Sequence, residues 1–471
     1  MKPSNIVQKI WSLCNILRGD GITYYQYVSE LSYLLFLKIA EENGSESLIP
    51  KGFRWSDLES YGGDDLLGFY QEMLTHLGVG AKNEVVKAIY AFPTTVFSHP
   101  ENLKAVVDGI SKIQWHQVGQ DGFGELYSGL IEKSAQDTRS GAGQYFTPRP
   151  LVDAIVKLTK PAWGEVIQDP AAGSGGFLVA ADNYVKCHPQ KNNHNKKPPK
   201  YQGVEIEKNT RRICLMNTFL HGLDANIIYG DALTEDGQDL EPADLILANP
   251  PFGSKAGGKR ALRGDIPYPA ANKQLAFLQH IYLGLKKGGR AAVVLPDNIL
   301  FDEGVGKTIR IELMQQCNLH TILRLPTGIF HGAGIKTNVL FFSRAKKAAD
   351  ATKEIWFYDM RANMPNFGKT FPLTENHFRD FAECFGSDPY GNSPRSDQGE
   401  SGRFRRFTRE EIAQRNNNLD ITWLRQNENS AGDTLTEIES ITSTILTHLR
   451  SALADIESVV DELADSVEAE K

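Results

Sequence analysis

The sequence lacks several features that would assign it to a familiar class. Its five cysteines show no paired or ligand spacing, which argues against a zinc site or a disulfide framework. The first residues do not have the pattern of a signal peptide, and the most apolar stretch, residues 31–39, is far shorter than the ~20 residues of a membrane span. We therefore expect a cytoplasmic protein with reduced thiols, no metal and no membrane segment.

The sequence also lacks an excess of positive charge. The formal net charge is -7, and residues 433–471 hold ten acidic side chains against two basic ones. The acidity therefore belongs to the tail, and the rest of the chain is close to neutral. Phosphate contacts supply most of the affinity of proteins that bind DNA unaided. The near-neutral charge of the body therefore argues against a protein that binds DNA without a partner.

A chain of 471 residues is too long for one ordinary domain. We predict a helical domain over residues 1–135, an α/β domain over residues 136–425 and an acidic C-terminal helix over residues 432–471. Thr434 and Glu437 form a capping box ahead of that helix, whose apolar residues recur at steps of three and four. Such a stripe needs a partner, for which we favour another subunit over the same chain.

Within residues 136–425, short apolar runs alternate with helical patterns. This alternation predicts a doubly wound α/β sheet. We expect seven strands, within residues 166–168, 201–206, 226–232, 245–248, 291–295, 319–325 and 337–343.

The fourth of these runs, residues 245–248, ends in Asn249, Pro250, Pro251 and Phe252. The two prolines predict a stiff turn at the carboxyl end of a buried strand, where open α/β sheets bind ligands. A side-chain amide and a free carbonyl can accept both hydrogens of an exocyclic amine, and the ring can stack on a flat heterocycle. These groups suit methylation of an amino group, although a lone Asn-Pro-Pro can merely end a strand.

The first strand ends in Asp169 and leads into a glycine-rich turn followed by a helix, which is the arrangement of nucleotide-cofactor sites. The turn contains Gly173, Ser174, Gly175 and Gly176. Its glycine spacing is not that of dinucleotide sites, and it lacks the Gly-Lys-Ser/Thr ending of a phosphate loop. Both differences disfavour NAD and ATP.

Acids end the next two strands. Glu205 is placed for ribose hydroxyls, and Asp231 for the amine of an adenine. Upstream, a segment that leads into a predicted helix could hold a carboxylate, or could simply cap that helix. It consists of Gln144, Tyr145, Phe146, Thr147, Pro148 and Arg149. After Phe252, a glycine-rich basic loop is expected to contact nucleic acid through Lys255, Lys259, Arg260 and Arg263.

In this order, the motifs resemble the amino-methyltransferases of DNA that place the cofactor motif before the catalytic turn. With the N-terminal helices, the chain resembles more closely the modification (methyltransferase) subunit of type I restriction-modification systems. The resemblance implies S-adenosylmethionine as methyl donor and N6 of a flipped adenine in double-stranded DNA as acceptor. It also implies a specificity subunit flanked by two copies of this chain, and a separate restriction (motor-nuclease) subunit. No target-reading domain is evident in the sequence, which fits recognition by a partner.

Carried over by position, residues 144–149 and 174–176 would border the methionine end of the cofactor. Glu205 would hold the ribose, and Asp231 the cofactor's adenine. Asn249 and the Pro250 carbonyl would accept hydrogen bonds from the target amine, and Phe252 would stack on the base. Asp169 could brace the glycine turn instead of touching the ligand.

Three other readings stay open on the sequence. A methyltransferase acting on a protein glutamine or on RNA would use the same amine-binding turn. A non-catalytic assembly subunit could keep the fold, although intact cofactor and catalytic turns argue against it. A dinucleotide oxidoreductase is disfavoured by the glycine spacing.

Overall fold

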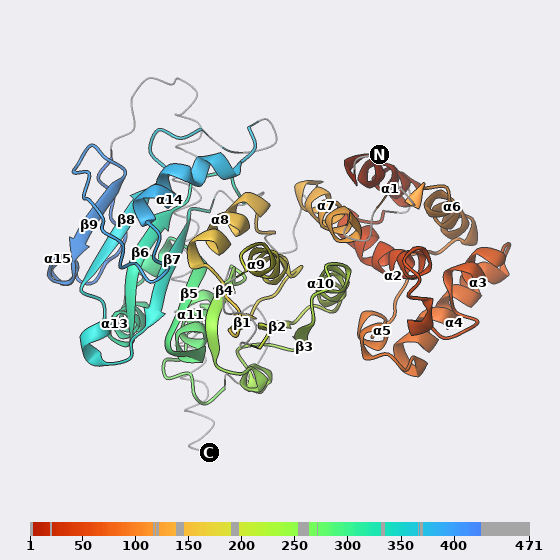
Figure 1. Cartoon of the computed structure of the whole chain (residues 1–471), viewed down its shortest axis with the longest axis horizontal. Helices are drawn as coiled ribbons and strands as arrows, with labels where there is room; N and C mark the ends of the chain where they lie inside the picture. The colour runs from red at the N-terminus through yellow and green to blue at the C-terminus, as the bar shows by residue number, and fades with distance from the viewer. Residues whose placement is uncertain are drawn as a thin grey trace, which may run out of the picture. The chain divides into compact units, whose positions relative to one another are not determined.

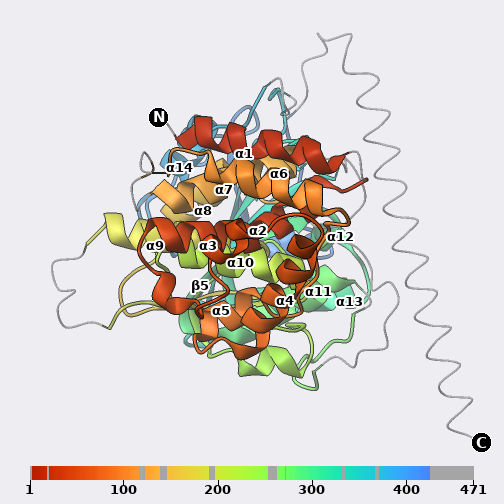
Figure 2. The same ribbon diagram turned by 90° about the vertical axis from the view of Figure 1, so that its right-hand side faces the viewer.

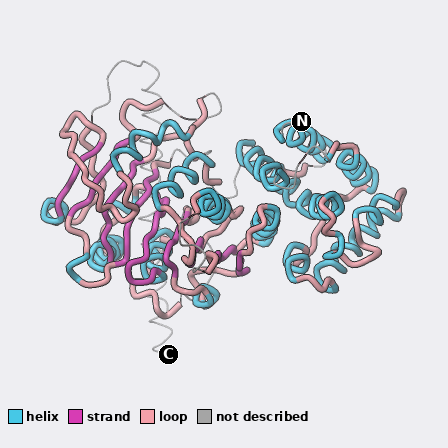
Figure 3. Tube along the Cα trace, in the orientation of Figure 1, coloured by secondary structure: helices cyan, strands magenta, loops and turns pink. Residues whose placement is uncertain are grey.

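The computed structural model describes residues 3–18, 21–115, 118, 122–137, 146–189, 197–252, 263–270, 272–330, 335–365, 367 and 371–424. Gln144, Tyr145, Lys255, Lys259, Arg260 and the predicted tail helix over 432–471 lie outside the described residues. Figures 1 and 3 show the arrangement of helices and strands.

The α-helices are α1 (Pro3–Arg18), α2 (Tyr24–Glu42), α3 (Trp55–Ser60), α4 (Asp65–Gly80), α5 (Glu84–Ile89), α6 (Pro100–Ser111), α7 (Gly122–Asp137), α8 (Arg149–Thr159), α9 (Gly176–Cys187), α10 (Lys208–Leu220), α11 (Lys273–Gly284), α12 (Asn298–Phe301), α13 (Val305–Gln316), α14 (Arg379–Phe385) and α15 (Arg409–Gln414). The strands are β1 (Val166–Asp169), β2 (Lys200–Glu205), β3 (Ala225–Tyr229), β4 (Ala243–Ala248), β5 (Leu285–Pro296), β6 (Cys317–Arg324), β7 (Thr337–Arg344), β8 (Glu354–Asp359) and β9 (Phe404–Thr408).

The chain divides into two compact units. The first comprises the described residues of Met1–Ser140 together with Ala172–Val179 and Glu205–Tyr229. The second comprises those of Gly141–Ala171, Ala180–Val204 and Gly230–Lys471. The predicted cofactor turn and Glu205 therefore belong to the first unit, and the Asn-Pro-Pro-Phe turn belongs to the second.

The first unit is mainly helical. As the sequence predicts, the described residues of 3–137 contain helices and no strand (Figure 3). α2 begins at a capping box in which Thr23 and Gln26 satisfy each other's backbone N–H groups. Helix α1 packs against α6 and α7, and α2 packs against α7 and α10 (Figures 1 and 2).

A buried arginine joins α10 to the N-terminal helices. The guanidinium of Arg212 lies 4.0 Å from the ring centroid of Tyr33 and donates hydrogen bonds to the Ser29 hydroxyl and the Ile89 carbonyl. Acceptors for two of its nitrogens and the face of the Tyr33 ring offset part of the cost of burying this cation. These contacts therefore fix α10, which follows Glu205 in the chain, on the helices of the N-terminal region.

The strands form one mixed sheet in the order β3-β2-β1-β4-β5-β7-β6-β8-β9. β1 pairs in parallel with β2 and β4, and β4 pairs in parallel with β5. β7 lies antiparallel between β5 and β6, β8 is parallel to β6, and β9 is antiparallel to β8. The carboxyl ends of β1 and β4 consequently lie at the same edge of the sheet.

Both faces of the central strands are covered. Leu340 and Phe342 of β7 belong to a buried cluster with residues of α11 and α13. Phe341, between them, contacts Phe381 and Phe385 of α14. Figure 1 shows α14 on the other side of the sheet from α11 and α13. Strands buried on both sides read as continuous apolar runs instead of alternating ones, which explains the pattern found in the sequence.

The α/β class is confirmed, but the expected strand count was too low. The seven predicted strands correspond to β1–β7, whereas β8 and β9 were not predicted. β9 is the edge strand and β8 lies next to it, and the long polar stretch that precedes Phe404 separates the two in the sequence, so no regular spacing indicated them. No helix among the described residues is long and apolar enough to cross a membrane.

Arg290 ties α8 to the sheet, and its loss should destabilise the protein. The side chain is 2% exposed, and it donates to the Thr159 and Lys160 carbonyls and to both oxygens of Glu165. We expect Arg290→Ala to cost about 2–4 kcal/mol of unfolding free energy, because the half-buried Glu165 and two carbonyls lose their donor. The urea midpoint of the full chain measures this change.

The control is Lys200→Ala. Lys200 pairs with Glu241, and these side chains are 63% and 57% exposed. Exposed pairs contribute about 0–1 kcal/mol. Equal midpoints for the two variants would contradict a structural role of Arg290.

Candidate active site

The carboxyl end of β4 carries the Asn-Pro-Pro-Phe turn. β4 is hydrogen-bonded to β1 on one side and β5 on the other, and residues 245–248 are fully buried. Because proline has no N–H, the ladder of hydrogen bonds cannot continue through Pro250 and Pro251. The turn therefore begins at Asn249, at the edge of the sheet, and Asn249 and Phe252 are half-buried there.

Thr147 holds the Asn249 side chain. The amide nitrogen of Asn249 donates a hydrogen bond of 2.9 Å to the Thr147 hydroxyl, across 102 residues of sequence. Thr147 lies just before α8, where the Pro148 carbonyl accepts hydrogen bonds from the N–H groups of Leu151 and Val152. Two segments that were predicted to flank the site are thus joined directly, and the Thr147 hydroxyl accepts from the amide.

An aromatic neighbour fixes the Phe252 ring. Phe330 lies 5.9 Å away between ring centroids, with an interplanar angle of 80°. This edge-to-face geometry is a favoured packing of two aromatic rings. The ring that the sequence predicted for stacking on a flat substrate is therefore supported from the side.

The glycine turn that follows β1 needs its glycines. Gly173 and Gly175 have φ values of +55° and +79°, which L side chains rarely adopt. A Cβ on Gly175 would lie 3.0 Å from the sulfur of Cys214. The Asp169 carboxylate accepts a hydrogen bond of 3.0 Å from the Ala171 N–H, so it braces the chain as it leaves β1.

Glu205, at the end of β2, is a buried carboxylate. One of its oxygens accepts a hydrogen bond of 2.9 Å from the Gly173 N–H, and the other accepts one of 2.8 Å from the Glu207 N–H. Its residue exposure is 8%. Burial raises the pKa of Glu205 to about 7, with a smaller contribution from the Glu207 charge and against the two N–H donors. Glu205 thus contacts the glycine turn and titrates near neutrality.

Asp231 follows β3 in a tight turn. Its carboxylate accepts a hydrogen bond of 3.0 Å from the Leu233 N–H, and its own N–H donates to Asp236 at 3.0 Å. The side chain is half-buried. These contacts orient the carboxylate that the sequence predicted for the adenine of a cofactor.

Comparison with known proteins identifies the family. A family model described as N-6 DNA Methylase matches residues 118–432, and one described as HsdM N-terminal domain matches residues 6–48. The chain is 41% identical to the type I restriction enzyme EcoKI methylase subunit of Escherichia coli K12 over 520 aligned positions, which cover 100% of this chain and 97% of that relative. The chain belongs to the methylase subunits of type I restriction enzymes.

A further relative and two solved structures agree with this family assignment. The EcoEI methylase subunit of Escherichia coli is 31% identical over 88% of this chain and 90% of its own length. The crystal structure of the EcoKI M protein shares 37% identity and a TM-score of 0.56, over 98% of this chain and 96% of that one. A structure concerned with complex assembly and conformational transition of the type I R-M system shares 26% identity and a TM-score of 0.74, over 98% of both chains.

In this methylase subunit, Arg263 is engaged within the chain. Its side chain is 8% exposed and forms a two-pronged ion pair with Asp265, at 2.6 and 2.5 Å. It also donates to the Nδ1 atom of His280 at 2.8 Å. The guanidinium is thus paired within the chain, and its predicted contact with DNA stays a prediction. The other three candidates lie outside the described residues.

Sequence reasoning missed a residue that supports the glycine turn. The buried Asn217 amide on α10 donates 2.9 Å to the Ser174 carbonyl and accepts a hydrogen bond of 3.1 Å from Ser128 on α7. The only sequence signal for this contact was a polar residue, Asn217, on an otherwise apolar helix face. Its partner Ser174 is 43 residues away in the sequence, so the sequence did not indicate which group Asn217 would contact. Within the described ranges, no group of three or more His, Cys, Asp or Glu could hold a metal ion.

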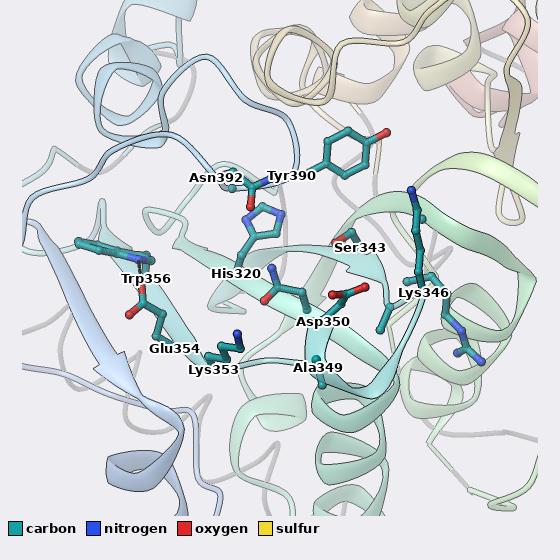
Figure 4. A pocket seen from close by; sticks show the side chains of 16 residues that line it. His320, Ser343, Lys346, Ala349, Asp350, Lys353, Glu354, Trp356, Tyr390 and Asn392 are labelled. Carbon is teal, nitrogen blue, oxygen red and sulfur yellow. Dashed lines mark hydrogen bonds between the residues drawn. The ribbon is translucent and has the colours of Figure 1, made fainter.

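A cavity of about 720 Å³ lies near the amino ends of β6 and β8, and Figure 4 shows residues that line it. Its lining includes His320, Lys346, Lys353, Trp356 and Tyr390. These residues come from the amino ends of β6 and β8, the chain just after β7 and the loop before β9, whereas the Asn-Pro-Pro-Phe turn is at the carboxyl end of β4. Burial and the Arg395 charge lower the pKa of His320 to about 3, so its ring is neutral. None of the predicted site residues that the structure describes lines this cavity.

The glycine turn offers a stability test with a neighbouring control. We expect Gly175→Ala to destabilise the full chain by about 1–2 kcal/mol, because the positive φ is strained for alanine and the new Cβ crowds Cys214. Gly176 starts α9 and has no positive φ, and a Cβ added to it would have no atom within 4 Å. Gly176→Ala should therefore be neutral or slightly stabilising.

Thermal unfolding of both variants measures the difference. A Gly175→Ala protein as stable as Gly176→Ala would contradict the requirement for glycine in this turn.

Proposed function

We propose that this methylase subunit transfers a methyl group from S-adenosylmethionine to N6 of an adenine flipped out of double-stranded DNA. The observation that carries the proposal is the Asn249-Pro250-Pro251-Phe252 turn directly after the fully buried residues 245–248 of β4, with the Asn249 amide held by Thr147. Membership of the N-6 DNA Methylase family supports the same substrate class.

The residues of the glycine turn suit S-adenosylmethionine. Gly173 and Gly175 lack side chains where the backbone has positive φ, so a ligand can approach the main chain closely. The buried Glu205 carboxylate beside Gly173 is an acceptor for two ribose hydroxyls. Asp231 would hold the adenine of the cofactor, while Ser174–Gly176 and the segment that includes Phe146–Arg149 would border the methionine end. When bound, S-adenosylmethionine supplies a methyl group on a positively charged sulfur.

The turn after β4 performs the chemistry on the acceptor. The lone pair of N6 is delocalised into the adenine ring, which makes the amine a poor nucleophile. Two acceptors, the Asn249 side-chain oxygen and the Pro250 carbonyl, favour a pyramidal nitrogen and so stabilise the transition state more than the ground state. Phe252 stacks on the base and keeps N6 aligned with the methyl group. A base inside a duplex cannot reach this geometry, and base flipping supplies it.

Sequence recognition would come from a partner. The chain outside its acidic tail is close to neutral, and Arg263 is paired internally. We infer that a specificity subunit binds two copies of this chain and reads the target, and that a restriction subunit adds cleavage. In this proposal residues 1–135 and 136–425 are the helical and catalytic domains, and residues 432–471 dock on another subunit.

The catalytic assignment predicts a separation of binding from transfer. We expect Asn249→Ala to bind S-adenosylmethionine normally and to lose about 10²–10³-fold in methyl transfer, the cost of removing one such electrostatic group. Transfer is measured with radiolabelled cofactor on the complex with its specificity subunit. The control is Asn318→Ala, at the other edge of the sheet, which should leave transfer unchanged.

DNA, RNA and protein are offered separately as acceptors in this assay. Label that enters RNA or protein and not DNA would reject the proposed substrate. Transfer at the wild-type rate by Asn249→Ala would reject the proposed turn.

The titration of Glu205 predicts that cofactor binding depends on pH. Its pKa of about 7 means that the carboxylate becomes ionised between pH 6 and pH 8. Hydrogen bonds to an ionised acceptor are roughly twice as strong as neutral ones. Affinity for S-adenosylmethionine should therefore rise with pH across this window, as calorimetry on the full chain can measure.

Glu205→Gln is the control, since its side chain keeps its shape and does not titrate. The mutant should bind more weakly than wild type at pH 8 and lose the part of the pH dependence that Glu205 causes. An identical pH profile in both proteins would show that Glu205 does not face the ligand.

A further inference from the structure

Tyr25, in the first turn of α2, reaches the segment that follows β2. Its hydroxyl donates a hydrogen bond to the carboxylate of Glu207 and forms another of 2.7 Å with the Thr210 hydroxyl. Tyr25 and Glu207 are 182 residues apart in the sequence. The sequence analysis assigned only packing or partner docking to the N-terminal helices, so this contact was not expected.

Glu207 connects this contact to the predicted ribose-binding acid. Its carboxylate caps α10 by accepting a hydrogen bond of 2.6 Å from the Thr210 N–H. Its own N–H donates to one oxygen of Glu205 at 2.8 Å. The other Glu205 oxygen accepts from the Gly173 N–H at 2.9 Å. Hydrogen bonds therefore run without a gap from Tyr25 to the glycine turn.

We propose that Tyr25 is a positioning residue for the cofactor: by holding Glu207, it fixes the Glu205 carboxylate in the orientation that binds the ribose hydroxyls. The N-terminal helices then contribute to the cofactor site without touching the ligand. This inference rests on the proposed function, in which Glu205 binds the ribose.

The electrostatics explain why a hydroxyl is needed at this place. Glu205 and Glu207 are two carboxylates close to each other, and the charge of each opposes ionisation of the other. Burial raises the pKa of Glu207, but hydrogen bonds from Tyr25, Thr210 and Asn209 outweigh burial and hold that pKa below its ordinary value. Tyr25 thus stabilises a charged Glu207 in a fixed position. Without the hydroxyl, Glu207 keeps its contacts with Thr210 but loses the one that holds it to α2, so the backbone that orients Glu205 is held less firmly.

A second link supports the reach of the N-terminal helices into the cofactor turn. Ser128 on α7 donates to Asn217, and Asn217 donates to the Ser174 carbonyl. This path ends at a different atom of the same turn. Contacts from two separate N-terminal helices therefore converge on the turn that includes Gly173 and Ser174.

The test compares two ligands on the full-length chain. Calorimetry measures the affinities of S-adenosylhomocysteine and of its 2′,3′-dideoxy analogue, which lacks the hydroxyls that Glu205 would bind. Wild type should prefer the ribose form, and Glu205→Ala should lose this preference. Tyr25→Phe, which removes one oxygen atom and keeps the ring, should reduce the preference about tenfold, the worth of a hydrogen bond to a charged group.

Tyr27→Phe is the matched control. It removes a hydroxyl from the same helix, where Tyr27 donates 2.7 Å to the buried Ile10 carbonyl, away from Glu207. It should keep the ribose preference even if the protein becomes less stable. Unfolding midpoints of both variants separate a stability loss from a positioning effect.

The outcomes distinguish the inference from the proposed function. A wild-type chain that binds neither ligand would reject the proposed cofactor. A wild-type preference that survives in Tyr25→Phe would overturn the positioning role, and so would equal weakening of both ligands. A preference that survives in Glu205→Ala would show that the ribose is held elsewhere, which also overturns the inference.

Discussion

The position of the candidate site depends on β4, a strand that cannot continue beyond Asn249. β4 is buried between β1 and β5, so every N–H and carbonyl along it must find a partner in those strands. Two prolines remove the N–H groups that further pairing would need. The chain is forced out of the sheet at Asn249, with a rigid backbone and an amide at the carboxyl edge. A mobile loop could present the same side chains, but it would lose entropy each time it ordered them.

Glu205, the buried acid at the end of β2, must likewise find hydrogen-bond partners within the protein. A carboxylate removed from water is costly unless donors surround it, and Glu205 has one backbone donor on each oxygen. Those donors do not lower its pKa below the ordinary range, because burial is the larger effect. A buried carboxylate in this state is stabilised when a ligand brings further hydrogen-bond donors, as two ribose hydroxyls would. Glu205 differs in this respect from Glu165, whose carboxylate already has the charged partner Arg290.

The parts that the sequence could predict are those with local causes. The turn at Asn249 follows from consecutive prolines after an apolar run, and the turn at Gly173–Gly176 follows from glycines between a strand and a helix. The reversed position of β7 between β5 and β6 could not be read in this way, because strand order is set by pairings among distant segments. β8 and β9 were missed for the related reason that their pairing partners, not their spacing, define them.

The contacts of Tyr25 illustrate the limit most clearly. Nothing in the residues around Tyr25 marks it, since neighbouring tyrosines of α2 serve packing: Tyr33 stacks on Tyr90, and Tyr27 bonds a backbone carbonyl. Its role emerges only because Arg212, Ser29 and Ile89 lock α10 against the N-terminal helices and so bring Glu207 within reach. Long-range packing here decides which polar groups meet. The segment that carries Glu205 and Glu207 consequently shares a compact unit with the N-terminal helices.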